Sequence, residues 1–412
     1  MFLVMGVNTI MNSEELYRDT MGPYFYEFCH RLHALATMYS TTANTRVYFC
    51  RRAGIVLYEL FRSFLKSNNI NPGYDLYDFP VSRIAAIKAA LAEDPMWGGH
   101  ICSMVFKNKT VRYLIEKLLS KQNEINIERY ISSFNSTILD AIISPGSVKQ
   151  WLSADSNNKS DNSIINYLNR QSECLTEHFS SLAGSNAIIV DSGLYGTVSE
   201  ILSGLYPEVK CISGFVYLSN YNKINPSPHM NYAYGLMGSS TKAKYSVNHS
   251  AVLRHWHFIE TLLEPENIDS VSEYSLKMEP IKLSMNNEQL LVADFFKSPF
   301  VYDINGVLAT MNRVLSHPSS REVSIIYSSR RTDDASGESK HIIINHELEA
   351  SIRKTDRLRR VNYGIVRRAL WREGQIVTSY GLVGYIYNGI RYYITKFRTA
   401  FLEKLISPIV GI

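Results

Sequence analysis

The sequence lacks most of the features that assign a protein to a compartment or a partner class directly. It has five cysteines in 412 residues, scattered along the chain, and no C-x-x-C pair. This usage argues against a disulfide framework or a thiolate metal site and predicts free, buried thiols in a reducing compartment. The net charge is also small for a chain of this length: a formal charge of +5 gives no reason to expect a nucleic-acid partner.

No targeting segment is evident. Residues 1–10 are apolar, but this stretch is short and has no basic region before it, so we expect neither a signal peptide nor a transmembrane helix there. No internal repeat is visible. The sequence therefore predicts a cytoplasmic protein of one large or two ordinary domains. With 45% apolar residues, the chain is long enough to bury a substantial core.

The rest of the chain is organised around residues 187–202. Four apolar residues predict a buried strand, a polar loop follows, and apolar periodicity then predicts a helix. A second apolar run, 211–218, resumes the sheet. In open α/β sheets, ligands bind at the carboxyl ends of the strands. Gly193 and Gly196, with the first N–H groups of the helix, are suited to cradle a phosphate, and Asp191 to reach hydroxyls or a metal. The alternative is an ordinary tight turn with a helix N-cap.

Two further junctions of the same kind precede this one. Residues 47–50 predict a buried strand, and the loop after it carries Arg51 and Arg52 before a helix resumes. Guanidinium groups bind phosphate oxygens bidentately, so this loop suits a pyrophosphate, although a solvated basic turn is the alternative. Residues 76–82, followed by Arg83, predict a third short strand before an Ala-rich helix.

Helical patterns dominate much of the remaining chain. They extend through residues 92–171, with clear runs at 111–119 and 125–143, and return at 14–38, 251–263 and 285–315. Gly22-Pro23 interrupts the first of these and predicts two helices. The exceptions are a polar, mobile loop at 153–163, an irregular stretch at 219–250, and two β-like runs at 323–327 and 342–344.

Two groups of titratable residues lie on the predicted helix 251–263. Glu260 and Glu264 are four residues apart and share a helix face, so one of them is a candidate general base; an exposed helix face is the alternative. His255 and His257 are two residues apart and point in different directions, which argues against a metal pair.

The C-terminal part is basic and aromatic. Eight basic residues occur between 353 and 372: Arg353, Lys354, Arg357, Arg359, Arg360, Arg367, Arg368 and Arg372. After residue 381 the chain interleaves Tyr385, Tyr387, Tyr392, Tyr393 and Phe397 with Arg391, Lys396, Arg398 and Lys404. This pattern is typical of a helix on an anionic membrane surface, and the alternative is a core helix with a basic outer side.

The three junctions together resemble the working edge of a phosphoribosyltransferase. The closer similarity is to the glycan phosphoribosyltransferase domain of bacterial ribofuranosyltransferases, polysaccharide-locus proteins often described as haloacid-dehalogenase-like. The segments that carry the resemblance are, in order, Gly22-Pro23 with Phe28, 47–54, 81–83, 190–197, 260–265 and 370–374. They span residues 20 to 375.

The resemblance implies an α/β fold, with a phosphoribosyltransferase-like, mostly parallel sheet, large helical insertions and a helical C-terminal part. The catalytic domain would cover residues 1–275, with a helical insertion at about 92–185, and a mostly helical region with the basic, membrane-associated tail would cover 276–412. The implied activity is transfer of phosphoribose from phosphoribosyl pyrophosphate to a sugar hydroxyl of a surface polysaccharide intermediate (O-antigen or capsule). The lipid-linked glycan acceptor would bring the enzyme to the cytoplasmic face of the inner membrane.

The resemblance also implies roles for particular residues. Pyrophosphate would be bound by Mg²⁺ and by Arg51, Arg52, Gly54, Ser82 and Arg83. The 5-phosphate would be bound by Ser192, Gly193, Tyr195, Gly196 and Thr197. Asp191 would bind the ribose or the metal, and Glu260 or Glu264 would accept the acceptor's proton.

Three departures keep alternatives open. The group usually has Arg-Asp-Gly where this chain has Ala53 between Arg52 and Gly54, and the phosphate loop has one acidic residue where two are usual. No phosphatase domain precedes the motifs, so a separate phosphatase would remove the 5-phosphate. A haloacid-dehalogenase-like phosphatase is an alternative, but no predicted strand ends in Asp-x-Asp. A catalytically inactive relative that acts in complex assembly is the other, and Ala53 is the feature that favours it.

Overall fold

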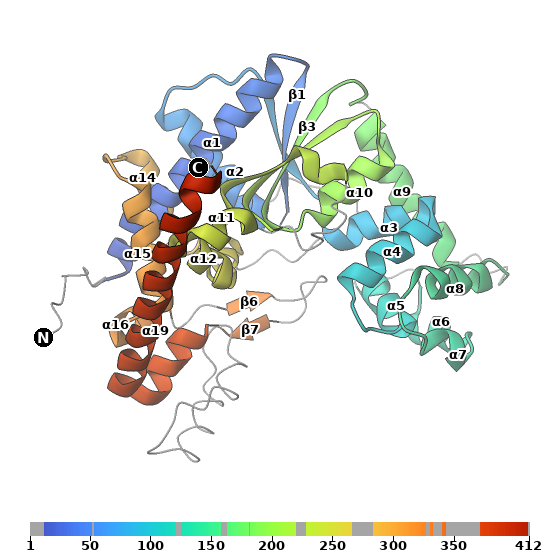
Figure 1. Cartoon of the computed structure of the whole chain (residues 1–412). Helices are drawn as coiled ribbons and strands as arrows, with labels where there is room; N and C mark the ends of the chain where they lie inside the picture. The colour runs from blue at the N-terminus through green and yellow to red at the C-terminus, as the bar shows by residue number, and fades with distance from the viewer. Residues whose placement is uncertain are drawn as a thin grey trace, which may run out of the picture.

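The computed structural model describes residues 12–51, 53–120, 125–157, 163–180, 182–219, 228–265, 283–326, 330–332, 340–342 and 371–410. Its centre is a five-stranded, all-parallel sheet (Figure 1). The strands are β1 (Thr45–Cys50), β2 (Asp75–Phe79), β3 (Asn186–Leu194), β4 (Lys210–Leu218) and β5 (Ala233–Ser239), in the spatial order β2-β1-β3-β4-β5. The α/β class predicted from the sequence is confirmed.

Alternation along the strands gives the sheet a hydrophobic core on each face. On β1, Phe49 belongs to one core and Tyr48 to the other; on β3, Val190 and Ile189 divide in the same way. The first core is covered by α1 (Gly22–Ser40), α2 (Ala53–Ser67) and α13 (Trp256–Leu263), and the second by α3 (Arg83–Glu93), α9 (Ile164–Ser180) and α10 (Thr197–Leu205). Helices therefore lie on both faces, as a buried parallel sheet requires (Figure 1).

The fifth strand was not predicted. Residues 219–250 read as irregular because β5 has two glycines and no β-branched residue. Its glycines are required by close packing: a Cβ at Gly238 would lie 2.5 Å from the Tyr217 ring on β4. After β5 the chain forms α11 (Ser240–Tyr245) and α12 (Val247–Arg254), so the irregular assignment is wrong from Ala233 onward.

The N-terminal helical segment changes geometry where predicted. A π-helical segment, η1 (Glu14–Met21), continues directly into α1 at Gly22, with Pro23 in the first turn of α1. Proline is tolerated there because a first-turn N–H has no partner within the helix. The cysteine prediction is confirmed in part. All five are free thiols, and four are buried, whereas Cys174 is intermediate.

A group of helices follows β2 and lies beside the sheet (Figure 1). It contains α4 (Pro95–Val105), α5 (Val111–Leu119), α6 (Ile127–Ser132), α7 (Ser136–Leu139) and α8 (Pro145–Asn157). The run 111–119 is confirmed as α5. The run 125–143 is two short helices because Asn126 and Asn135 each cap a new start. The predicted loop at 153–163 is wrong for residues 153–157, which belong to α8. The division into domains at residue 275 stays a prediction.

The C-terminal helices differ from the sequence pattern in two places. The predicted helix at 285–315 is two helices, α14 (Asn287–Lys297) and α15 (Ile304–Ser316), because Pro299 interrupts the chain and Asp303 caps the second start. The β-like run at 323–327 is helical up to Ile326, in α16 (Ser320–Ile326), whose Glu322 forms a buried ion pair with Arg313. Tertiary pairing thus overrides β-propensity there. Residues 340–342 form β7 (Lys340–Ile342), paired with β6 (Arg330–Thr332).

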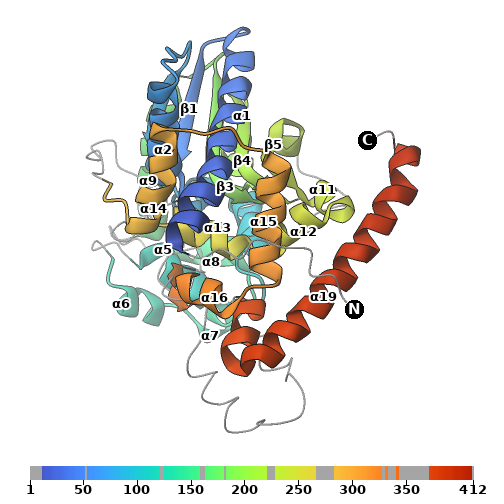
Figure 2. The ribbon, with the colours of Figure 1, turned by 90° about the vertical axis from the view of Figure 1, so that its left-hand side faces the viewer.

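The last helix, α19 (Arg372–Val410), has two arms. Gly381 has a φ of +56° and ψ of −129°, and this non-helical residue separates a short first arm from a long second arm (Figure 2). Asn388 on the second arm donates to the Glu373 carbonyl on the first, at 2.9 Å. Among the described residues, no helix combines the length and the apolarity needed to cross a membrane. Seven of the eight basic residues between 353 and 372 lie outside the described part of the chain; only Arg372 is within it.

Candidate functional site

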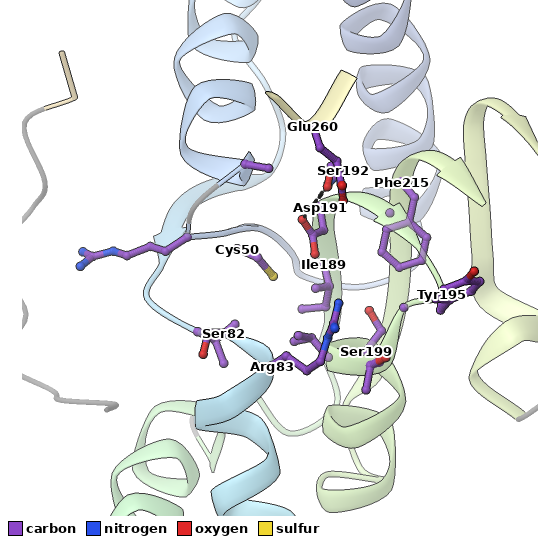
Figure 3. A pocket seen from close by; sticks show the side chains of 17 residues that line it. Cys50, Ser82, Arg83, Ile189, Asp191, Ser192, Tyr195, Ser199, Phe215 and Glu260 are labelled. Carbon is purple, nitrogen blue, oxygen red and sulfur yellow. Dashed lines mark hydrogen bonds between the residues drawn. The ribbon is translucent and has the colours of Figure 1, made fainter. Parts of the chain in front are cut away.

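The candidate site lies where the strand order of the sheet reverses. From β1 the chain passes to β2 on one side, whereas β3 lies on the other side of β1. Such a switch point separates the loops that follow two neighbouring parallel strands, and ligands of open α/β sheets bind in the crevice between them. A pocket with about 760 Å³ of empty space, part of it open to solvent, lies at this point (Figure 3).

Strand alternation directs Asp191 into the pocket. Ile189 on β3 belongs to the core under α3 and α10, and Asp191, two residues later, faces the same side. The Asp191 carboxylate accepts a hydrogen bond from the Ser192 backbone N–H at 2.7 Å and a longer one from its hydroxyl at 3.4 Å. These bonds hold one carboxylate oxygen in place at the pocket wall (Figure 3).

The loop from Gly193 to Gly196 needs its glycines. Gly193 has a φ of +127°, and a Cβ there would lie 2.2 Å from the Tyr217 carbonyl oxygen. Gly196 has a φ of +69°, and a Cβ there would lie 2.9 Å from the Phe215 ring. Both positions therefore combine a left-handed backbone with a close approach. Gly196 is the N-cap of α10 and supplies no side-chain cap.

Three helices begin at the pocket. Ala53 opens α2, Arg83 opens α3 and Thr197 opens α10, and all three residues line the pocket. The N-terminus of a helix carries about half a positive charge, and its first N–H groups have no partner within the helix. In α10 the side chain of Ser199 also lines the pocket; its Oγ is buried and has no hydrogen-bond partner among the described residues. This arrangement is suited to a ligand with more than one anionic group.

The arginines occupy different environments. Arg51 lines the pocket, but its guanidinium group forms an ion pair with Asp78 on β2, with Nη2 3.0 Å from Oδ2. Arg83 is exposed and reaches from α3 toward Ser199 (Figure 3). Arg52 lies outside the described residues. The sequence analysis did not identify Asp78 as the partner of Arg51, although β2 carries two acidic residues, Asp75 and Asp78.

Only one of the two candidate general bases lies at the site. Glu260 lines the pocket and points toward Ser192 (Figure 3). The prediction that Glu260 and Glu264 share a helix face is wrong, because α13 ends at Leu263 and Glu264 has an extended backbone. Glu264 is not among the residues that line the pocket.

The other predicted residues have distinct roles. Ser82 lines the pocket and caps α3 by accepting a hydrogen bond from the Ala85 N–H at 3.1 Å. Gly54 is not among the lining residues; a Cβ there would lie 3.3 Å from the Val190 carbonyl oxygen, so this glycine lets α2 pack closely on β3. Ala53, by contrast, lines the pocket at the position where the resembled group has an aspartate.

Cys50 lines the pocket but is not an available nucleophile. Burial raises the pKa of its thiol well above the usual value, and the charges of Asp191 and Asp78 raise it further. The thiol therefore stays protonated at neutral pH, which excludes a resting thiolate.

Neither protein-family models nor curated proteins match this chain. The function proposed below therefore rests on the chemistry of the site itself. Ten of the thirteen residues predicted for the site line this one pocket: Arg51, Ser82, Arg83, Asp191, Ser192, Gly193, Tyr195, Gly196, Thr197 and Glu260.

The donor set suits a magnesium ion that arrives with its substrate. The described residues contain no cluster of three metal-binding side chains. The pocket does contain the carboxylates of Asp191 and Glu260. Mg²⁺ is commonly held by one or two carboxylates together with substrate phosphates and water. Asp191, whose orientation is fixed by Ser192, is the residue that fits this role.

His255 and His257 lie at the start of α13, away from the residues that line the pocket. His255 lies between α12 and α13, and burial, with the charges of Arg254 and Arg372, lowers its pKa to about 3. Its Nε2 lies 3.7 Å from a Glu373 carboxylate oxygen. The rings of His255 and His257 are neighbours, with centroids 6.0 Å apart, so the prediction that these side chains point in different directions is wrong. The reason is that His255 lies between two helices and not within one.

Proposed function

We propose that the protein is a glycosyltransferase that transfers phosphoribose from phosphoribosyl pyrophosphate to a sugar hydroxyl of a surface polysaccharide intermediate. The observation that carries the proposal is the convergence of three helix N-termini, Arg83 and Asp191 on one pocket at the β1/β3 switch point. This donor carries anionic groups at both ends of a hydroxylated ring, and the pocket offers anion-binding groups on two sides of a carboxylate.

The 5-phosphate is assigned to the loop before α10. The backbone N–H groups from Thr197 onward, which have no side-chain cap, are suited to bind its oxygens, and the buried Ser199 hydroxyl adds a donor. Gly193 and Gly196 allow the backbone to approach the phosphate closely. The pyrophosphate is assigned to Arg83 and to the starts of α2 and α3, which also line the pocket.

The charge balance of the pocket supports a donor that binds with Mg²⁺. Among the described residues, Arg51 forms an ion pair with Asp78, and Arg83 lines the pocket together with the carboxylates of Asp191 and Glu260. Without a bound cation, the negative charges of pyrophosphate would be repelled by these two carboxylates. The ion, when bound, would supply the positive charge that neutralises the leaving group, and Asp191 would hold it.

The chemical step follows from these positions. The bond between ribose C1 and the pyrophosphate oxygen breaks, its electron pair leaves with pyrophosphate, and the acceptor hydroxyl oxygen bonds to C1. Glu260, which lines the pocket, would accept the proton of that hydroxyl. Arg83 and the helix N-termini stabilise the charge that develops on the leaving group. The product keeps its 5-phosphate, which a separate phosphatase would remove.

The second arm of α19 supports a peripheral contact with an anionic membrane. Its outward face carries Val383, Ile386, Ile390, Tyr393 and Phe397, spaced alternately by three and four residues and all well exposed. Lys396 and Arg398 on the same arm are exposed as well. An apolar helical stripe with basic neighbours matches the interface of an anionic bilayer, where a lipid-linked acceptor would reside.

The direct test is an assay of phosphoribosyl pyrophosphate with Mg²⁺, with and without a panel of glycans. We expect pyrophosphate release that depends on a glycan, and an acceptor that gains the mass of one phosphoribosyl group. A phosphatase would instead release inorganic phosphate. Donor binding without turnover on any glycan would favour the inactive relative, and absence of donor binding would exclude the proposal.

A further inference from the structure

A buried histidine lies against the loop to which the 5-phosphate is assigned. His229 belongs to a 3₁₀ helix, η2 (Pro228–Tyr232), which packs on β4 and α10. The residue is 7% exposed. Its Nε2 lies close to the N-cap of α10, because a Cβ at Gly196 would be 3.3 Å from this nitrogen. His229 is not among the residues that line the pocket, so it contacts the loop without occupying the space of a ligand.

The surroundings of the His229 ring set its charge. Both ring nitrogens are buried, and neither forms a hydrogen bond of ordinary geometry with the described residues. Burial lowers the pKa of His229 below its ordinary value, and this effect outweighs the carboxylate of Glu200 on α10 and the backbone of Tyr195 in the loop, which both raise it. On the β4 side, the charge of Lys210 lies over the ring of Tyr232, at the other end of η2. His229 is therefore neutral at neutral pH.

The start of α10, next to this histidine, offers free donors to an anion. Gly196 provides no side-chain cap for the first N–H groups of the helix. Ser199, in the first turn, is 1% exposed and lines the pocket (Figure 3). Its Oγ has no hydrogen-bond partner among the described residues. A phosphate bound to these groups would lie beside Gly196, and its charge would favour the protonated form of the His229 ring.

We propose that His229 is a positioning residue that takes up a proton when a phosphate group binds at the start of α10. The proton comes from the solvent and returns to it when the phosphate leaves. The imidazolium ring stabilises the bound dianion across the loop, and its contact at Gly196 holds the loop in place. The inference rests on the proposed function, because the 5-phosphate of the donor is the group that it assigns to this loop.

The linked proton gives the binding of phosphate a defined pH dependence. The complex carries the proton on His229 and the free protein does not, so a fall in pH favours the complex. The affinity rises by at most about tenfold per pH unit for one proton. The rise ends where the pH falls below the pKa of His229 in the free protein. The ligand's own phosphate titrates near pH 6, and this contribution is the same for every variant of the protein.

Calorimetry of ribose 5-phosphate with the full-length protein measures both the affinity and the protons exchanged. The protons are obtained at pH 7 from the binding enthalpies in two buffers of different ionisation enthalpy. We expect net proton uptake by the parent, and less uptake by His229→Gln. The ratio of the Kd of His229→Gln to that of the parent should rise at least about threefold between pH 8 and pH 6.5. His100→Gln, at an exposed histidine of α4, is the control and should match the parent.

The outcomes separate this inference from the proposed function. Binding with equal proton uptake in the parent and in His229→Gln would overturn the role of His229 and leave the phosphate assignment intact. Binding without net proton uptake by the parent would do the same, and this measurement does not require the variant to fold. Absence of binding by ribose 5-phosphate would overturn both the inference and the assignment of the 5-phosphate to this loop.

Discussion

At the scale of single residues, the candidate site depends on where a side chain is held and what already binds it. Asp191 lies on the central strand β3 and Asp78 on the edge strand β2, where Asp78 forms an ion pair with Arg51. Asp191 accepts a hydrogen bond from the Ser192 N–H and lines the pocket, whereas Asp78 is not among the lining residues. This difference in position makes Asp191, and not Asp78, the candidate for contact with a ribose or a metal.

The first prediction tests Asp191 at this scale. Asp191→Asn retains an oxygen that can accept from the Ser192 N–H, so we expect the fold and the melting temperature to stay the same. We expect kcat/KM for transfer to fall by at least about 100-fold, because a charged contact with the ligand is lost. Thr197→Ala should also lower transfer without unfolding the protein. Steady-state kinetics give kcat/KM for each purified variant, and a melting curve gives its melting temperature. Unchanged turnover in Asp191→Asn would remove the assignment of the donor loop.

A second prediction tests the role of Arg83 in donor binding. Arg83→Gln should weaken binding of phosphoribosyl pyrophosphate by about tenfold or more, because Arg83 reaches into the pocket. Arg112→Gln, an exposed arginine of α5 that faces Asp140, is the control and should bind as the parent does. Calorimetry in the presence of Mg²⁺ provides both affinities. If Arg83→Gln binds the donor normally, the pyrophosphate must lie elsewhere.

At the scale of elements, the sequence predicted the parts of the site that depend on local pattern. β-branched and aromatic residues identify β1, β3 and β4, and the short strand predicted at 76–82 corresponds to β2. Most of the pocket residues follow β1, β2 and β3. β5 could not be found this way, because it has no β-branched residue and its two glycines are required by close packing, Gly235 against Leu218 and Gly238 against Tyr217. The end of α13 at Leu263, which removes Glu264 from the shared face, is likewise fixed by tertiary contacts: Gln289 on α14 donates to the Glu264 carbonyl oxygen.

The junction of α12, α13 and α19 gives a pH-dependent prediction. His255 is buried there, and its pKa is lowered to about 3, chiefly by burial. Its ordinary value in an unfolded chain is about 6.5. As the pH falls below 6.5, the unfolded chain therefore binds a proton that the folded protein does not, and the free energy of unfolding falls. The slope approaches about 1.4 kcal/mol per pH unit well below 6.5, and the loss continues down to about pH 3.

Urea unfolding at several pH values between 7 and 5.5 measures this slope. We expect the free energy of unfolding to depend less steeply on pH in His255→Gln than in the parent, whatever the absolute stability of the variant. His100→Gln, at an exposed histidine of α4, is the control. An identical slope in His255→Gln and the parent would show that His255 does not contribute to the pH dependence.

At the scale of the whole molecule, the sheet separates two helical regions. The helices that follow β2 lie beside one face, and α14, α15 and α19 lie toward the other (Figures 1 and 2). The candidate site opens at the carboxyl ends of the strands. The helix α19 packs against α12, α15 and α16 with one side and exposes its apolar stripe on the other, so the stripe is available for a surface contact.

The last prediction concerns this stripe. Each exposed apolar side chain that enters the bilayer interface contributes up to about 1.5–3 kcal/mol, and each neighbouring basic residue about 1 kcal/mol at low salt. Deleting the arm would also remove the buried Asn388 and Tyr392, so substitution on the exposed face is the better test. The variant that combines Ile386→Ser, Ile390→Ser and Phe397→Ser should lose co-sedimentation with anionic vesicles, whereas Leu290→Ser, at an exposed residue of α14, should retain it. High salt should weaken binding of the parent, because the contact is partly electrostatic. The alternative outcome is that the parent protein does not bind anionic vesicles at low salt but forms a dimer. If the same triple substitution abolishes that dimer, the stripe binds a second copy of the chain.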